Sequence, residues 1–198
     1  MTFETFNIFP TTVYVGEVNE HQKHKEEFYK IYPKFDYEET CEDNTVSENL
    51  GKPFIHLESN LDPLFAEIVS HAKKYTCEVL GYKDIFDYVI TKTWLSRSRA
   101  TYENIKWHTH STSHISFSYY LNTPRNSHTL KFANPHNTNS LFVGLNNSDV
   151  KDGVAERNEL NASTFHLEPK EGSLILFPSS LDHSTQCNHN TFNGERLA

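Results

Sequence analysis

Cysteine, long apolar runs and clusters of positive charge are all scarce in this sequence of 198 residues. Its three cysteines, Cys41, Cys77 and Cys187, are odd in number and irregularly spaced, which favours a reducing cytoplasm over a disulfide framework. No apolar stretch approaches the roughly 20 residues that a membrane-spanning helix needs. The first residues lack the basic segment and apolar run of a signal peptide. These absences predict a soluble cytoplasmic protein without a membrane partner.

Negative charge outweighs positive charge in the chain. There are 26 Asp and Glu against 18 Lys and Arg, which gives a formal net charge of −8 at pH 7. A protein that binds a phosphate backbone needs a basic face, and no Lys/Arg cluster supplies one here. We therefore do not expect a nucleic acid to be the main partner. The length fits one domain, residues 1–198, and 14 Phe and 10 Tyr can fill a bulky core.

Two helices are expected in the first half of the chain. The segment 20–32 reads as a surface helix that ends at Pro33. The segment 63–80 has apolar residues at helical spacing, with Asp62 as its expected N-cap, Pro63 in its first turn and Gly81 at its end. The segment between them, 34–57, reads as an acidic loop with at most one edge strand.

Short strands are expected to dominate the rest of the chain. The period-two pattern predicts strands at 6–17, where Pro10 interrupts it, and at 88–95, 107–121, 129–133, 164–169 and 173–177, with turns at 96–104 and 170–172. The polar segment 136–163 is equally compatible with a lid and with a plain loop. The expected fold is α+β and mainly β: a double-stranded β-helix, or jelly roll, with supporting N-terminal helices.

Histidines are the candidate functional residues. His108 and His110 are separated by one residue, so on a strand their side chains would leave the same face. His183 follows an apolar strand and the turn Pro178–Leu181. Two imidazoles on one strand and a third at a distant strand end can form a metal site with open positions. The chain contains 12 histidines, however, and spacing alone does not bring 108 and 183 together.

Two blocks around these histidines resemble the 2-oxoglutarate- and Fe(II)-dependent oxygenase superfamily, and in particular a group common in bacteria and phage. Residues 108–120, HTHSTSHISFSYY, are similar to its pattern H-x-H-P-x-S-x-x-S-G-x-Y-Y, and residues 172–183 to G-x-L-x-x-F-P-S-x-L-x-H. Residues 9–14 also look like the N-terminal strand of that group. The resemblance implies a dioxygenase that uses Fe(II), 2-oxoglutarate and O2 to hydroxylate a C–H bond of a peptide side chain or a small-molecule substrate. A phage-encoded member would act in the host cytoplasm.

The resemblance also implies roles for single residues. His108, His110 and His183 stand at the positions of the iron ligands and are the catalytic set. Arg196 matches the arginine that pairs with the far carboxylate of 2-oxoglutarate. Tyr120 stands where prolyl hydroxylases direct a tyrosine hydroxyl at that carboxylate, and Leu130 belongs to the same co-substrate pocket.

Two departures from the family pattern keep other functions open. His110 stands where most relatives have a carboxylate, which raises the net charge at iron by one. Relatives also continue past the arginine with a further strand, whereas this sequence stops at Ala198, so either the chain is clipped or the site is incomplete. A non-catalytic metal- or ligand-binding jelly roll and a cupin-like three-histidine oxygenase without 2-oxoglutarate are the alternatives. Asp182, beside His183, would point away from the site on a strand.

Overall fold

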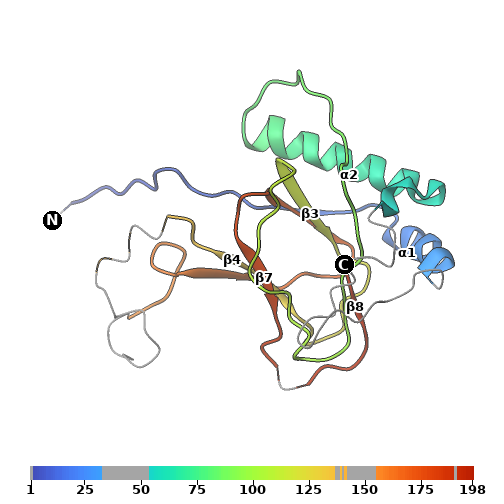
Figure 1. Ribbon diagram of the computed structural model, residues 1–198. Coiled ribbons are helices and arrows are strands. Elements are labelled where there is room, and N and C mark those ends of the chain that lie inside the picture. Colours follow the sequence, from blue (N-terminus) through green and yellow to red (C-terminus); the bar gives the residue numbers. More distant parts are fainter. Residues whose placement is uncertain (1, 33–53, 137–138, 140, 142–154, 190) are drawn as a thin grey trace.

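The computed structural model describes residues 2–32, 54–136, 139, 141, 155–189 and 191–198 (Figure 1). The helices are α1 (His21–Ile31), the short 3-10 turns η2 (Ile55–Leu57) and η3 (Ser59–Leu61), α2 (Asp62–Lys74) and the π-helical turn η4 (Tyr75–Val79). The strands are β1 (Tyr14–Glu17), β2 (Arg97–Ser98), β3 (Ile115–Tyr119), β4 (Thr129–Ala133), β5 (Thr164–Leu167), β6 (Ser173–Pro178), β7 (His183–Gln186) and β8 (Arg196–Leu197).

In the described chain the strands form three antiparallel sheets. Their orders are β1-β6-β3, β5-β4-β7 and β2-β8. Figure 1 shows α2 lying along β3, with α1 nearby and the pair β4–β7 below. The fold is thus strand-rich with a small helical part and is compatible with a jelly-roll-like arrangement.

Strand β6 forms the middle of the core because both of its faces are buried. Leu174 and Leu176 pack in one cluster with side chains of α1, α2 and β3. Ile175 and Phe177, on the opposite face, pack in a second cluster with residues of β4. Successive side chains of a strand point to opposite faces, so a continuous apolar run is what this position requires. The layers are therefore helices, the β1-β6-β3 sheet and then the β5-β4-β7 sheet.

The helices largely follow the predicted pattern. Leu64 and Ile68 of α2 and Tyr75 of η4 are buried, at 3%, 2% and 1% exposure, and a buried Leu or Ile contributes about 1.5–3 kcal/mol to stability. The expected N-cap is wrong: Asp62 lies inside the helix, Leu61 is the N-cap residue and no side chain caps it. Beyond η4, Gly81 has a φ of +76°, a conformation that favours glycine.

Several strand predictions are confirmed, and three are wrong in part or entirely. β4, β5, β6 and the 170–172 turn lie where they were expected, but in the first strand only Tyr14–Glu17 is paired. The predicted strand 88–95 is absent: within it only Thr93 forms an isolated bridge, with Phe54, and Val89 is 80% exposed. The expected turn at 96–104 contains β2 instead.

The 107–121 prediction is half correct. Only Ile115–Tyr119 is a strand, so His108 and His110 lie in an irregular extended segment before β3. Most of the loops expected at 34–57 and 136–163 lies outside the described residues, and so does the choice between lid and loop. Among the described helices, none is long and apolar enough to cross a membrane.

Candidate metal centre and anion pocket

His108 and His183 are brought together by the backbone. The N–H of His108 donates to the carbonyl of His183, and the N–H of His183 donates to the carbonyl of His108, both at 3.0 Å. This isolated antiparallel bridge places the two residues directly opposite each other, and their ring centroids lie 4.2 Å apart. The meeting of the two histidines thus follows from pairing between distant segments, which spacing in the sequence does not reveal.

His110 is held by Ser179 in the turn between β6 and β7. The N–H of His110 donates to the carbonyl of Ser179 at 2.9 Å, and the N–H of Ser179 donates to the carbonyl of His114 at 3.1 Å. The Ser179 hydroxyl, which is buried, lies 2.8 Å from those of both Ser113 and Ser116. Sequence reasoning assigned no role to these serines, although all three stand in the two blocks that carry the family resemblance.

The three imidazoles converge on one point. One nitrogen of each ring lies within 4.8 Å of the nitrogens of the other two, an arrangement that can hold a metal ion. The Nε2 atoms of His110 and His183 are 3.2 Å apart. Two ligands at about 2.1 Å from a metal are about 3.0–3.4 Å apart for octahedral to tetrahedral angles. The spacing of this pair therefore suits a shared ion.

The backbone prepares two of the rings for binding through Nε2. Nδ1 of His108 lies 2.8 Å from the carbonyl of Lys106, and Nδ1 of His183 lies 2.9 Å from the carbonyl of Leu181. A proton on each Nδ1 donates to these carbonyls, which leaves the Nε2 lone pair free. Burial lowers the pKa of His183 to about 4, with smaller contributions from His108 and His110, so this ring is neutral at pH 7.

Aromatic side chains pack against two of the three imidazoles. The rings of Trp94 and His110 have centroids 5.3 Å apart, and those of Phe177 and His183 are 4.7 Å apart. These contacts limit the rotation of two of the three rings and keep water from their sides. Asp182 is exposed, in line with the prediction that it points away.

Arg196 is a buried charged side chain that lines the same cavity as the histidines. It is 1% exposed, and within the described residues its Nε and Nη1 have no hydrogen-bond partner and no carboxylate pairs with it. Its guanidinium carbon lies 5.1 Å from the ring centroid of Tyr120, which is fully buried and whose hydroxyl is also unpartnered in that part of the chain. A buried charge without a counter-charge is strongly unfavourable, so the pair forms a pocket suited to an anion.

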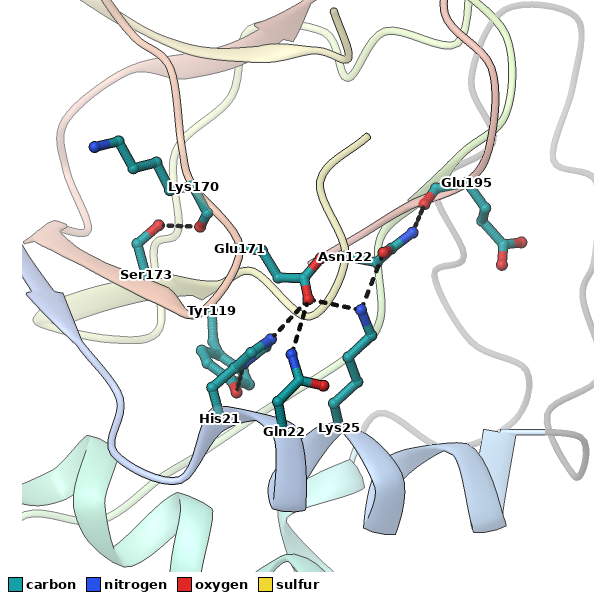
Figure 2. Close-up of polar contacts among 9 residues, drawn as sticks. All are labelled: His21, Gln22, Lys25, Tyr119, Asn122, Lys170, Glu171, Ser173 and Glu195. Carbon is teal, nitrogen blue, oxygen red and sulfur yellow. Dashed lines mark hydrogen bonds and ion pairs between the residues drawn. The ribbon is translucent and has the colours of Figure 1, made fainter. Parts of the chain in front are cut away.

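Asn122 fixes the backbone on both sides of Arg196. Its Nδ2 donates to the carbonyl of Glu195, and its main chain exchanges hydrogen bonds with Leu197 at 2.9 and 3.3 Å. Its Oδ1 accepts a hydrogen bond from Nζ of Lys25 at 3.1 Å. Figure 2 shows Lys25 reaching from α1 to both Asn122 and Glu171. The short strand β8 is therefore held by helix α1 as well as by β2, and sequence reasoning did not find this contact.

The histidines and the arginine line one large cavity, which also extends along helix α2. Its lining includes His108, His110, His183, Leu130 and Arg196. Leu130 is 4% exposed and packs in the same apolar cluster as Tyr120. All six residues predicted as site residues thus lie at or beside this cavity, although they come from segments between positions 108 and 196.

A strand-rich fold with three convergent imidazoles and a buried guanidinium on one cavity defines a candidate metalloprotein with an anion pocket. The chain belongs to the 2-oxoglutarate- and Fe(II)-dependent oxygenases. The family described as “Putative 2OG-Fe(II) oxygenase” matches residues 92–198, which is more than half of the chain and includes all the histidines of the cluster and Arg196. No curated protein matches the sequence. The family implies an oxygenase that uses Fe(II) and 2-oxoglutarate.

Proposed function

We propose that this protein is an Fe(II)- and 2-oxoglutarate-dependent dioxygenase that hydroxylates a C–H bond of a peptide side chain or a small molecule. One observation carries the proposal: a fully buried Arg196, which pairs with no carboxylate among the described residues, lines the same large cavity as three convergent imidazoles. A metal site alone would not need this guanidinium. A co-substrate with a metal-chelating end and a distant carboxylate uses both.

The histidines fit Fe(II) as a set of donors. Imidazole is a common ligand for iron, and three of them leave coordination positions for a co-substrate and O2. His108, His110 and His183 would hold the ion, and the carbonyls of Lys106 and Leu181 would keep His108 and His183 oriented. Bound Fe(II) would supply the redox chemistry that couples O2 to the oxidative decarboxylation of 2-oxoglutarate.

Arg196 and Tyr120 fit the far carboxylate of the co-substrate. A guanidinium pairs with a carboxylate through two parallel hydrogen bonds, and a phenol hydroxyl adds a third donor. Leu130 would pack against the methylene carbons between the two ends of 2-oxoglutarate. Because Tyr120 and Arg196 are buried, water competes weakly for the carboxylate, which strengthens the pairing.

The fold that supports this function is, in our proposal, a double-stranded β-helix formed by a single domain, residues 1–198. The support is the packing of the β1-β6-β3 sheet against the β5-β4-β7 sheet through β6 and β4. The histidines lie at the connection between these sheets, where His108 bridges to the first residue of β7.

A second candidate is a three-histidine oxygenase that does not use 2-oxoglutarate. His110 favours it, because a neutral ligand set leaves the full charge of the metal to be balanced by another ligand. The two candidates differ in what they require of Arg196. An enzyme without 2-oxoglutarate tolerates Arg196→Met, whereas the first candidate loses its co-substrate.

Metal binding and co-substrate consumption, measured separately, test the proposal. We expect one Fe(II) per chain and slow conversion of 2-oxoglutarate to succinate even without a substrate. His108→Ala should abolish both, and His189→Ala, which removes an exposed histidine, should change neither. Metal binding without any succinate would favour the second candidate or a non-catalytic module. No metal binding would refute the proposal.

A further inference from the structure

His128 is a buried polar side chain that neither the fold nor the metal centre explains. It lies immediately before β4, is 1% exposed, and packs edge-on against Phe192, with ring centroids 5.4 Å apart and planes at 87°. Neither ring nitrogen has a hydrogen bond of normal geometry within the described residues. A structural histidine at this depth would be expected to satisfy at least one nitrogen.

The turn that carries His128 packs on the segment that leads to Arg196. A Cβ atom on Gly194 would lie 3.0 Å from the side chain of Pro124, so the two segments are in close contact. At the other end of the turn, Sγ of Cys187 lies 3.4 Å from the carbonyl of Asn126. The turn that carries His128 therefore contacts the segment just before Arg196 and the residue that follows β7.

The charge on Arg196 reaches the His128 ring. Burial first and the Arg196 charge second lower the pKa of His128 to about 4, while Glu103 and a weak contact with the Thr101 backbone oppose the shift. The imidazole is consequently neutral at pH 7. Arg196 thus presents a positive charge to this neutral ring, and the Glu103 carboxylate acts on the ring with the opposite sign.

Three buried side chains thus leave five polar atoms unpartnered in the described chain. These are Nε and Nη1 of Arg196, the hydroxyl of Tyr120 and both nitrogens of His128. Leaving so many buried polar atoms unsatisfied is unfavourable unless a ligand completes them. A carboxylate has two oxygens with about four lone-pair sites and a single negative charge, which matches this set.

We propose that His128 is a third contact, beside Arg196 and Tyr120, for the far carboxylate of the co-substrate. This inference rests on the proposed function. The neutral imidazole donates one N–H to a carboxylate oxygen, and it does so in preference to the Thr101 carbonyl because a charged acceptor forms the stronger hydrogen bond. His128 then distinguishes 2-oxoglutarate from keto acids that lack a second carboxylate.

The test compares the binding of two keto acids to the Fe(II)-loaded protein without O2. 2-Oxoglutarate has the far carboxylate, and 2-oxobutyrate chelates the metal in the same way but lacks it. Dissociation constants are measured from the visible absorption of the chelate for wild type, His128→Ala, His128→Gln and the exposed control His189→Ala. Thermal unfolding of each variant without keto acid shows whether the fold is intact.

In His128→Ala we expect the Kd of 2-oxoglutarate to rise about tenfold or more and that of 2-oxobutyrate to stay within about twofold. His128→Gln, which keeps a donor, should recover part of the loss, and His189→Ala should bind both acids like wild type. An unchanged Kd of 2-oxoglutarate overturns the inference, and so does an equal loss for both acids. If wild type binds 2-oxobutyrate as tightly as 2-oxoglutarate, the far carboxylate is not bound by this pocket and the inference is overturned. If it chelates neither, the proposed function fails as well.

Discussion

Arg196→Met separates a ligand-binding arginine from a structural one. Methionine keeps most of the length and apolar volume of the side chain but removes its charge. Arg196 is 1% exposed and has no carboxylate partner among the described residues. If its role is to bind an anion, the protein without ligand carries an unfavourable buried charge, and the substitution removes that charge.

The expected effect on binding is large. Two charge-assisted hydrogen bonds to a carboxylate contribute about 1.5–3 kcal/mol each, so their loss should raise the Kd of 2-oxoglutarate by about 100-fold to 10,000-fold. The affinity for Fe(II) should not change, because Arg196 is not one of the three clustered histidines.

The expected effect on stability has the opposite sign. The substitution removes a cation–π contact with Tyr120, at 5.1 Å, which contributes about 0.5–2 kcal/mol, but it also removes the desolvation penalty of an unpaired charge, which is several kcal/mol. Without ligand, the variant should be at least as stable as wild type. It should also lose the stabilisation that 2-oxoglutarate gives to the Fe(II) form of wild type.

Chemical denaturation and thermal unfolding with and without 2-oxoglutarate measure both effects, with Arg125→Met, at an exposed arginine, as the matched control. An anion-binding role for Arg196 is refuted if Arg196→Met lowers the stability of the ligand-free protein by about 3 kcal/mol or more while 2-oxoglutarate still binds. In that case the guanidinium supports the fold and not the co-substrate.

Four further results are expected. His183→Ala should bind Fe(II) at least 100-fold more weakly in a competition assay with a chelator, because only two of the three imidazoles remain. Asn122→Ala should raise the Kd of 2-oxoglutarate several-fold and leave that of Fe(II) unchanged, because the Glu195 carbonyl before Arg196 loses its donor. Burial acts to raise the pKa of Glu171, but hydrogen bonds from Lys25 and His21 of α1 outweigh it and hold the pKa below its usual 4.5. Glu171→Gln should therefore lower stability by about 0.5–1 kcal/mol at pH 7. This difference should disappear as the pH falls through the lowered pKa of Glu171, because the carboxylate is then protonated. Between pH 6.5 and about 4 the unfolded chain binds a proton at His128 that the folded chain does not, so stability decreases as the pH is lowered. In urea titrations His128→Gln should reduce this pH dependence by up to about 1.4 kcal/mol per pH unit.

The local sequence pattern was sufficient to predict elements whose apolar side chains are buried as the pattern requires. The apolar run of β6 and the spacing of Leu64 and Ile68 in α2 identify these elements because both are buried as the pattern requires. The alternation at 88–95 misled because it describes a segment able to form a strand but does not show whether a partner is present. Strands β2 and β8 have two residues each and are too short to have a period.

The candidate site was also predictable from the sequence only in part. The histidines and Arg196 were found from residue type and family resemblance, but their convergence depends on the bridge between His108 and His183, which is a long-range contact. The roles of Ser179, Asn122 and His128 depend on hydrogen bonds and burial. The local sequence does not show which serine, which asparagine or which of the 12 histidines is buried or hydrogen-bonded, so only the folded chain reveals these roles.

Whether the three histidines and Arg196 bind iron and 2-oxoglutarate together can be decided by anaerobic titration of the Fe(II)-loaded protein with 2-oxoglutarate, followed by visible absorption. We expect a charge-transfer band that saturates at one 2-oxoglutarate per chain, is absent in His108→Ala and needs far more 2-oxoglutarate in Arg196→Met. Tight Fe(II) binding with no such band at any concentration of 2-oxoglutarate would contradict this expectation.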